Sequence, residues 1–167
     1  ADINSYMKTV EDIKISDNVN VVAIGEAAHG CKYFQELKLS VLKKMVKDYD
    51  FRAFALEADY GECAAINRYI QGGDGDIESI VKTFSFPIYR TKQMEELISW
   101  MREYNSTVSE GEKLRFYGFD MQNPETSYEF LKNYCTSKGL TSADEFDKNL
   151  DCIEKGEISV ELSLIHI

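Results

Sequence analysis

The stretch VNVVAIGEAAHG at residues 19–30 decides the fold, and the rest of the chain is organised around it. It opens as a nearly unbroken apolar run, turns at Gly25, and then presents Glu26 and His29 three residues apart. A continuous apolar run is typical of a strand that is buried on both faces of a parallel sheet. We therefore expect a strand over residues 19–25, with Glu26 and His29 just beyond its carboxyl end.

Strand-like and helical patterns alternate along the remainder of the chain. Apolar runs at residues 51–58 and 113–119 predict two further strands, and apolar residues at helical spacing predict helices between and around them. The predicted helices cover residues 3–15, 32–49, 61–70, 77–83, 91–104, 127–138 and 142–154. This order predicts an α/β fold with a mainly parallel sheet flanked by helices. Three strands are few for so much helix, so we expect residues 1–161 to be the N-terminal part of one larger α/β domain.

The last six residues, LSLIHI at 162–167, resemble the translation of a sequencing adapter. We expect this tail to be non-native and exclude His166 from every site.

Composition narrows the classes of function. The chain has 167 residues, 44% of them hydrophobic, and a formal net charge of -10. Nucleic acids and anionic membrane surfaces repel such a charge, and no apolar run is long enough to cross a bilayer. The four cysteines form no CxxC pair, which favours reduced thiols in a cytoplasmic protein.

Each predicted strand ends in an acid, namely Glu26, Glu57 and Asp120. The carboxyl ends of parallel strands meet at one edge of a sheet, where ligands bind. We therefore expect these acids and His29 to lie close together. Carboxylates beside a histidine favour its imidazolium form and orient its ring, as a general base requires. An acid at a strand end also caps a following helix, and that role stays open for each acid taken singly.

Four kinds of chemistry compete for this group. His29 could deprotonate a water that attacks an ester, with Glu26 or Glu57 orienting the ring. The histidine and the three acids could instead bind a divalent metal that activates the water. Cys31, near the start of a helix, could be a nucleophile. Finally, the group could line a binding pocket without catalysis.

Lys38 lies about two turns into the predicted helix that follows His29. It is either one of several solvated lysines or a cation that closes over the pocket and steadies an anion.

Six stretches of the chain resemble the erythromycin esterase family. They are GEAAHG (25–30), FQELKLSVLKKMV (34–46), FALEA (54–58), NRYIQGG (67–73), WMREYN (100–105) and FYGFDMQ (116–122). The resemblance implies a hydrolase that opens the lactone ring of macrolide antibiotics by water attack. Its substrate would be a small-molecule ester, and its role would be antibiotic resistance.

The resemblance also implies roles for particular residues. His29 would be the general base, and Glu26 and Glu57 would be orienting or proton-relay carboxylates. Lys38 stands where characterised members usually have arginine, and an ammonium lacks the planar fork that binds a carboxylate in two places. Lys38 and Asp120 would support the site or bind substrate. No cofactor is required, although a divalent metal stays open.

Family members are much longer and complete the site with histidines from their second half. We therefore expect the chain as given to be inactive by itself. The alternative from another class is a metal-binding or haem-binding module without hydrolytic turnover.

Overall fold

The computed structural model describes residues 8–121 and 125–154, with side chains described as far as Asn149. Two parallel strands, β1 (Ala53–Asp59) and β2 (Arg115–Asp120), form the described sheet. The helices are α1 (Lys32–Tyr49), α2 (Tyr60–Ile70), α3 (Ile77–Lys82), α4 (Lys92–Thr107), α5 (Glu125–Ser137) and α6 (Ala143–Glu154). Short 3-10 turns lie at Val10–Asp12, Pro87–Tyr89 and Glu110–Glu112. The predicted α/β class with a parallel sheet and flanking helices is confirmed.

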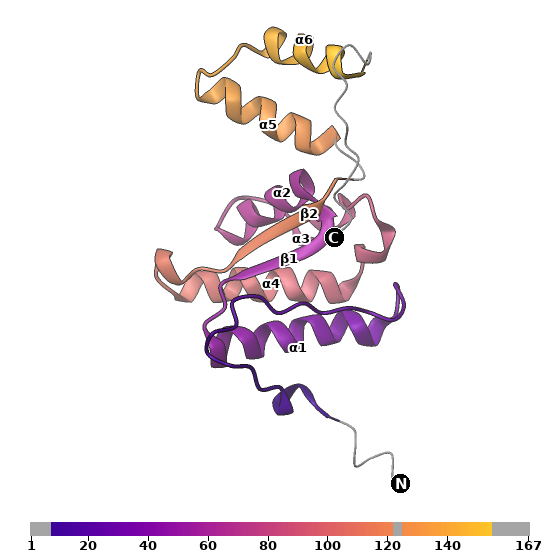
Figure 1. Ribbon diagram of the computed structural model, residues 1–167, viewed down its shortest axis with the longest axis vertical. Coiled ribbons are helices and arrows are strands. Elements are labelled where there is room, and N and C mark those ends of the chain that lie inside the picture. Colours follow the sequence, from indigo (N-terminus) through magenta and orange to yellow (C-terminus); the bar gives the residue numbers. More distant parts are fainter. Residues whose placement is uncertain (1–7, 122–124, 155–167) are drawn as a thin grey trace.

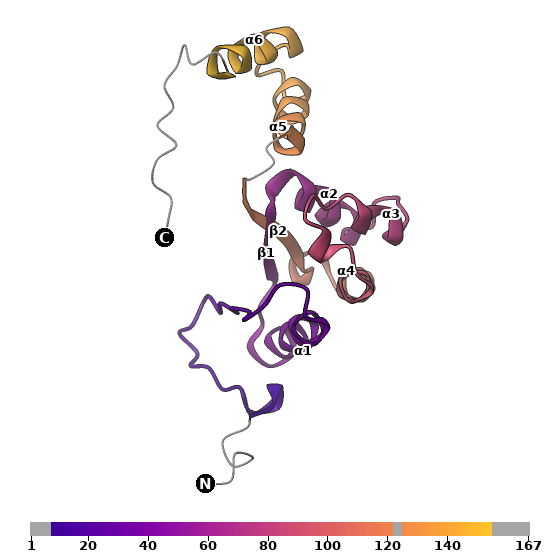
Figure 2. The ribbon, with the colours of Figure 1, turned by 90° about the vertical axis from the view of Figure 1, so that its right-hand side faces the viewer.

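Helices cover one face of the two strands. Figure 2 shows α2, α3 and α4 on the same side of β1 and β2. The core between these elements is apolar, and its largest fully buried side chains include Phe84, Phe116, Ile66, Ile70, Met94, Leu97, Ile98 and Met101. On the opposite face Ala53, Ala55, Tyr117 and Phe119 are exposed.

The predicted helix over residues 32–49 is confirmed as α1. Its buried apolar stripe, at Val41, Leu42, Met45 and Val46, repeats at helical spacing and packs toward the rest of the molecule. The helix ends at Asp50, which adopts the left-handed conformation with φ 61°. Aspartate tolerates that conformation better than most residues with a side chain.

The other predicted helices and strands also form, with boundaries shifted by a few residues. The N-terminus of α4 shows why the sequence pattern succeeds. The side chain of Thr91 accepts a hydrogen bond from the backbone N–H of Met94 at 3.2 Å. This bond satisfies one of the amides that the first turn of a helix leaves without a partner.

The two strands approach closely at their carboxyl ends. A methyl group at Gly118 would overlap the backbone of Ala58 and Asp59, so the close contact requires glycine there. The strand register shifts between Leu56 and Asp59, and Asp59 then lies opposite Asp120.

The predicted strand over residues 19–25 is wrong. This segment has no regular secondary structure and passes between α1 and β1 (Figure 1). Val21 is 81% exposed and Ile24 44% exposed, although their side chains are strongly apolar. A continuous apolar strand needs cover on both faces, and the described chain supplies helices on one face of the sheet only.

The predicted helix over residues 3–15 is also wrong where it can be judged. Residues 8–15 contain only the 3-10 turn Val10–Asp12, and residues 3–7 lie outside the described part. A short helix needs tertiary packing of its apolar face, and this turn buries no residue. Ile13 and Ile15 instead use their backbone, since the hydroxyl of Tyr49 bonds to both.

The predicted tail at residues 162–167 lies outside the described residues. None of the described helices combines the length and apolar character needed to cross a membrane.

Candidate active site

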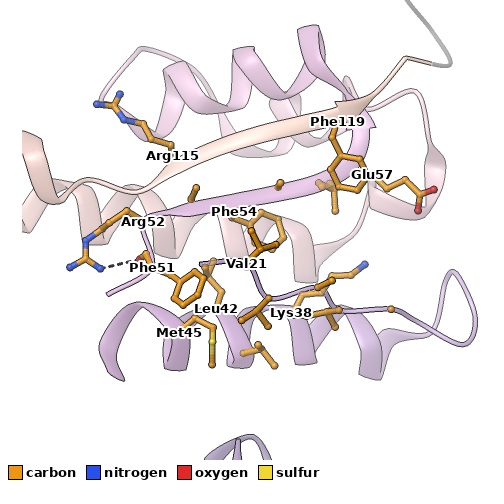
Figure 3. A pocket seen from close by; sticks show the side chains of 18 of the residues that line it. Val21, Lys38, Leu42, Met45, Phe51, Arg52, Phe54, Glu57, Arg115 and Phe119 are labelled. Atoms are coloured by element: carbon orange, nitrogen blue, oxygen red, sulfur yellow. Dashed lines mark hydrogen bonds between the residues drawn. The ribbon is translucent and has the colours of Figure 1, made fainter. Parts of the chain in front are cut away.

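A pocket of about 910 Å³ lies between residues 19–25, α1 and β1. Figure 3 shows its apolar middle, where Leu42 and Met45 of α1 and Phe54 of β1 point inward. Charged side chains lie at both ends. Lys38 and Glu57 occupy one end, and Arg52 and Arg115 the other.

Glu26, His29 and Lys38 form a connected polar cluster at the first of these ends. The Nδ1 atom of His29 lies 2.7 Å from Oε1 of Glu26, and Nζ of Lys38 lies 2.8 Å from Oε2 of the same carboxylate. The Nζ atom also donates a hydrogen bond to Oε1 of Gln35 at 3.1 Å. Glu26 therefore has one partner for each of its oxygens.

The three side chains of this cluster differ in exposure. Those of Glu26 and Lys38 are both 12% exposed, whereas that of His29 is 63% exposed. Burial disfavours the charged form of Glu26, but hydrogen bonds from Lys38 and His29 outweigh burial and lower the pKa of this carboxyl. The carboxylate is thus held ionised and directed at the histidine ring.

Glu57 lines the same pocket, as its position at the end of a strand predicts. It is an exposed residue, and Figure 3 places its carboxylate at the same end as Lys38. The edge argument therefore brings Glu26, His29 and Glu57 to one pocket, although residues 19–25 are not a strand.

Asp120 does not line the pocket. It lies opposite Asp59, and its Oδ1 atom accepts the backbone N–H of Met121 at 2.8 Å. This local bond matches the capping role that remained open for each acid in the sequence.

Two further residues at this end were missed by sequence reasoning. Gln35, 3% exposed, accepts the hydrogen bond from Lys38, and Tyr89, 2% exposed, places its ring 5.3 Å from Nζ of the same lysine. Gln35 is one turn before Lys38 on α1, which is a usable signal for an i,i+3 contact. Tyr89 is distant in sequence and belongs to no motif, so only the fold reveals it.

The metal and cysteine alternatives find little support in the geometry. Among residues 8–121 and 125–154, no three His, Cys, Asp or Glu side chains come together as a group that could hold a metal ion. Cys31 is half-buried at the N-cap of α1 and is not among the residues that line the pocket. Burial raises the pKa of Cys63 to about 12, so that thiol stays protonated.

The fold and the pocket together define an α/β protein with a polar cluster at one end of an apolar cavity. The chain belongs to the erythromycin esterase family, because the family profile described as "Erythromycin esterase" matches residues 46–163. The match includes Glu57 and Asp120. It begins after Glu26, His29 and Lys38, so the roles of these three residues rest on geometry and on the resemblance of residues 25–46.

Two curated relatives are esterases of Escherichia coli. The chain is 34% identical to erythromycin esterase type II over 117 residues, which cover 69% of this chain and 26% of that protein. It is 23% identical to erythromycin esterase type I over 111 residues, covering 65% of this chain and 26% of that protein. The chain thus spans about a quarter of these relatives.

Two solved structures share the fold. One is a Bacillus cereus protein with a TM-score of 0.60 and 25% identity, covering 81% of this chain and 32% of that one. The other is described as a succinoglycan biosynthesis protein, with a TM-score of 0.51 and 30% identity, covering 60% and 25%.

Proposed function

We propose that the whole protein is a hydrolase that opens a macrolide lactone or a related carboxylic ester, with His29 as the general base. The observation that carries the proposal is the 2.7 Å contact between Nδ1 of His29 and Glu26. When Nδ1 carries the proton and donates it to the carboxylate, Nε2 is left with a lone pair. No hydrogen bond occupies Nε2 within the described residues, so it is available to a water molecule.

The chemistry follows from this arrangement. Nε2 takes a proton from water as the water oxygen bonds to the ester carbonyl carbon. The carbon–oxygen bond of the ester then breaks, and the leaving alkoxide takes the proton back from His29. The products are a carboxylic acid and an alcohol, which remain one molecule when the substrate is a lactone. Glu26 stabilises the transient imidazolium, as a buried carboxylate does in a catalytic triad.

Lys38 and Glu57 have secondary roles in this proposal. Lys38 holds the second oxygen of Glu26 at 2.8 Å and so fixes the carboxylate that orients His29. Glu57 lies at the same end of the pocket and can relay protons between solvent and the reacting water. The apolar middle of the pocket suits the hydrocarbon body of a macrolide.

The test is hydrolysis by the full product of the gene, since this chain spans about a quarter of its relatives. Macrolide inactivation and the cleavage of a panel of simple esters are measured for the wild type and for His29→Ala. We expect the variant to lose about 10²–10⁴-fold in rate, the usual contribution of a general base. Lys32→Ala is the control, since Lys32 is exposed and pairs only with Glu36 among the described residues.

Unchanged cleavage in His29→Ala would remove the central claim. Cleavage of simple esters without macrolide cleavage would keep the chemistry and reject the macrolide as substrate.

A further inference from the structure

Tyr89 is a buried tyrosine that lines the pocket together with Glu26, His29 and Lys38. It is the last residue of the 3-10 turn Pro87–Tyr89, in the connection between α3 and α4. It therefore reaches the pocket from a part of the chain that is separate from residues 19–30 and from α1.

The ring of Tyr89 is held on several sides. Its centroid lies 5.4 Å from that of Phe84 and 6.3 Å from that of Phe86, and Nζ of Lys38 lies 5.3 Å away. Its backbone carbonyl accepts the N–H of Thr91 at 2.9 Å, directly before α4. Such packing leaves the hydroxyl with little freedom, which is what a preorganised hydrogen-bond donor needs.

The hydroxyl of Tyr89 is protonated at neutral pH. Burial, followed by the nearby carboxylates of Glu26, Glu57 and Asp120, raises the pKa of this phenol to about 12. The influence of all three acids also places the hydroxyl at the acidic end of the pocket. Within the described residues no hydrogen bond engages it, so its proton is available to a ligand.

The cationic donors that line the pocket already have acceptors. Lys38 contacts Glu26 and Gln35. Arg52 donates to the backbone carbonyls of Val46 and Phe51, and Arg115 donates to Glu110. Among the described lining residues, Tyr89 therefore offers the neutral donor nearest to the proposed base.

We propose that the Tyr89 hydroxyl donates a hydrogen bond to the carbonyl oxygen of the bound ester and stabilises the negative charge that forms there. This inference rests on the proposed hydrolysis and supplies its oxyanion donor. As water adds to the carbonyl carbon, the carbonyl π electrons move to the oxygen, and the phenol strengthens its hydrogen bond without giving up its proton. When the ester bond breaks, the electron pair returns and the interaction weakens.

The test uses Tyr89→Phe in the full gene product, because phenylalanine keeps the ring against Phe84, Phe86 and Lys38 and removes only the hydroxyl. We expect kcat for ester cleavage to fall about 10²-fold with KM changed less than about threefold, since the donor acts mainly in the transition state. Tyr104→Phe is the matched control. Tyr104 is a half-buried tyrosine on α4 whose ring packs on Trp100, outside the pocket.

A second arm measures binding rather than turnover. Methyl benzylphosphonate mimics the charged tetrahedral intermediate, and we expect Tyr89→Phe to weaken its binding about tenfold while leaving the binding of neutral methyl phenylacetate unchanged. An unchanged kcat, an effect on KM alone, or equal phosphonate binding by variant and wild type would overturn the proposal. A wild type that hydrolyses no ester but loses phosphonate affinity in Tyr89→Phe would reject the hydrolase and retain the Tyr89 donor.

Discussion

At the scale of single residues, Glu26 joins the parts of the candidate site. Its two carboxylate oxygens contact side chains from different segments, His29 in the loop before α1 and Lys38 within α1. Because Glu26 is 12% exposed, these contacts matter more than they would at the surface. Histidine orientation and helix position are therefore coupled through one side chain.

Replacing Glu26 by glutamine should reduce stability in a manner that depends on pH. The pKa of Glu26 is lowered in the folded protein, so its charge stabilises the fold above its ordinary pKa of 4.5. That stabilisation is lost as pH falls through the lower folded pKa. We expect urea unfolding to show Glu26→Gln less stable than wild type near pH 7, with the difference closing near pH 3.

Glu36→Gln provides the comparison for this prediction. Glu36 pairs with Lys32 at 3.2 Å, and the two side chains are 48% and 72% exposed. Exposed pairs of this kind contribute little. An equal pH dependence for both variants would contradict the role given to Glu26.

At the scale of helices and strands, local patterns succeed wherever the element packs on its neighbours. α1 and α4 form as their apolar stripes predict, and each buries that stripe. Residues 19–25 show the opposite case, since a strand requires a partner strand and cover on both faces. Periodicity identifies an apolar segment, but it does not report whether a partner is present.

The N-cap of α4 gives a prediction at this scale. Thr91→Ala removes the 3.2 Å bond to the N–H of Met94 and should lower the free energy of unfolding by about 1 kcal/mol. Thr107→Ala is the control at the other end of α4, where the threonine hydroxyl donates to the carbonyl of Tyr104 and is exposed. Chemical denaturation of both variants measures the difference, and equal losses would show that the cap is not responsible.

At the scale of the whole molecule, the described chain has one covered and one bare sheet face. Tyr117 and Phe119, 43% and 68% exposed, lie on the bare face, and Val21 is exposed beside the same pocket. Contiguous exposed apolar surface of this kind marks a binding or packing surface. The covered face carries the core, and the bare face carries the pocket.

We expect this bare face to bind the apolar dye ANS. Phe119→Ser should reduce dye fluorescence, because Phe119 lines the pocket. Leu140→Ser is a close control, since Leu140 is 69% exposed and lies between α5 and α6, away from the pocket. If both variants reduce fluorescence equally, the dye binds exposed apolar residues in general rather than this face.

The sequence by itself determined the helices, the two strands that pair, the α/β class and the acids at the strand ends, because these depend on local spacing and on short-range capping. It also singled out Glu26, His29, Glu57 and Lys38, which the fold places around one pocket. Only the tertiary structure decided that Tyr89 joins them, that Asp120 lies off the pocket and that residues 19–25 pair with no strand. These features depend on contacts between segments far apart in the chain, and the spacing of residues within one segment carries no information about them.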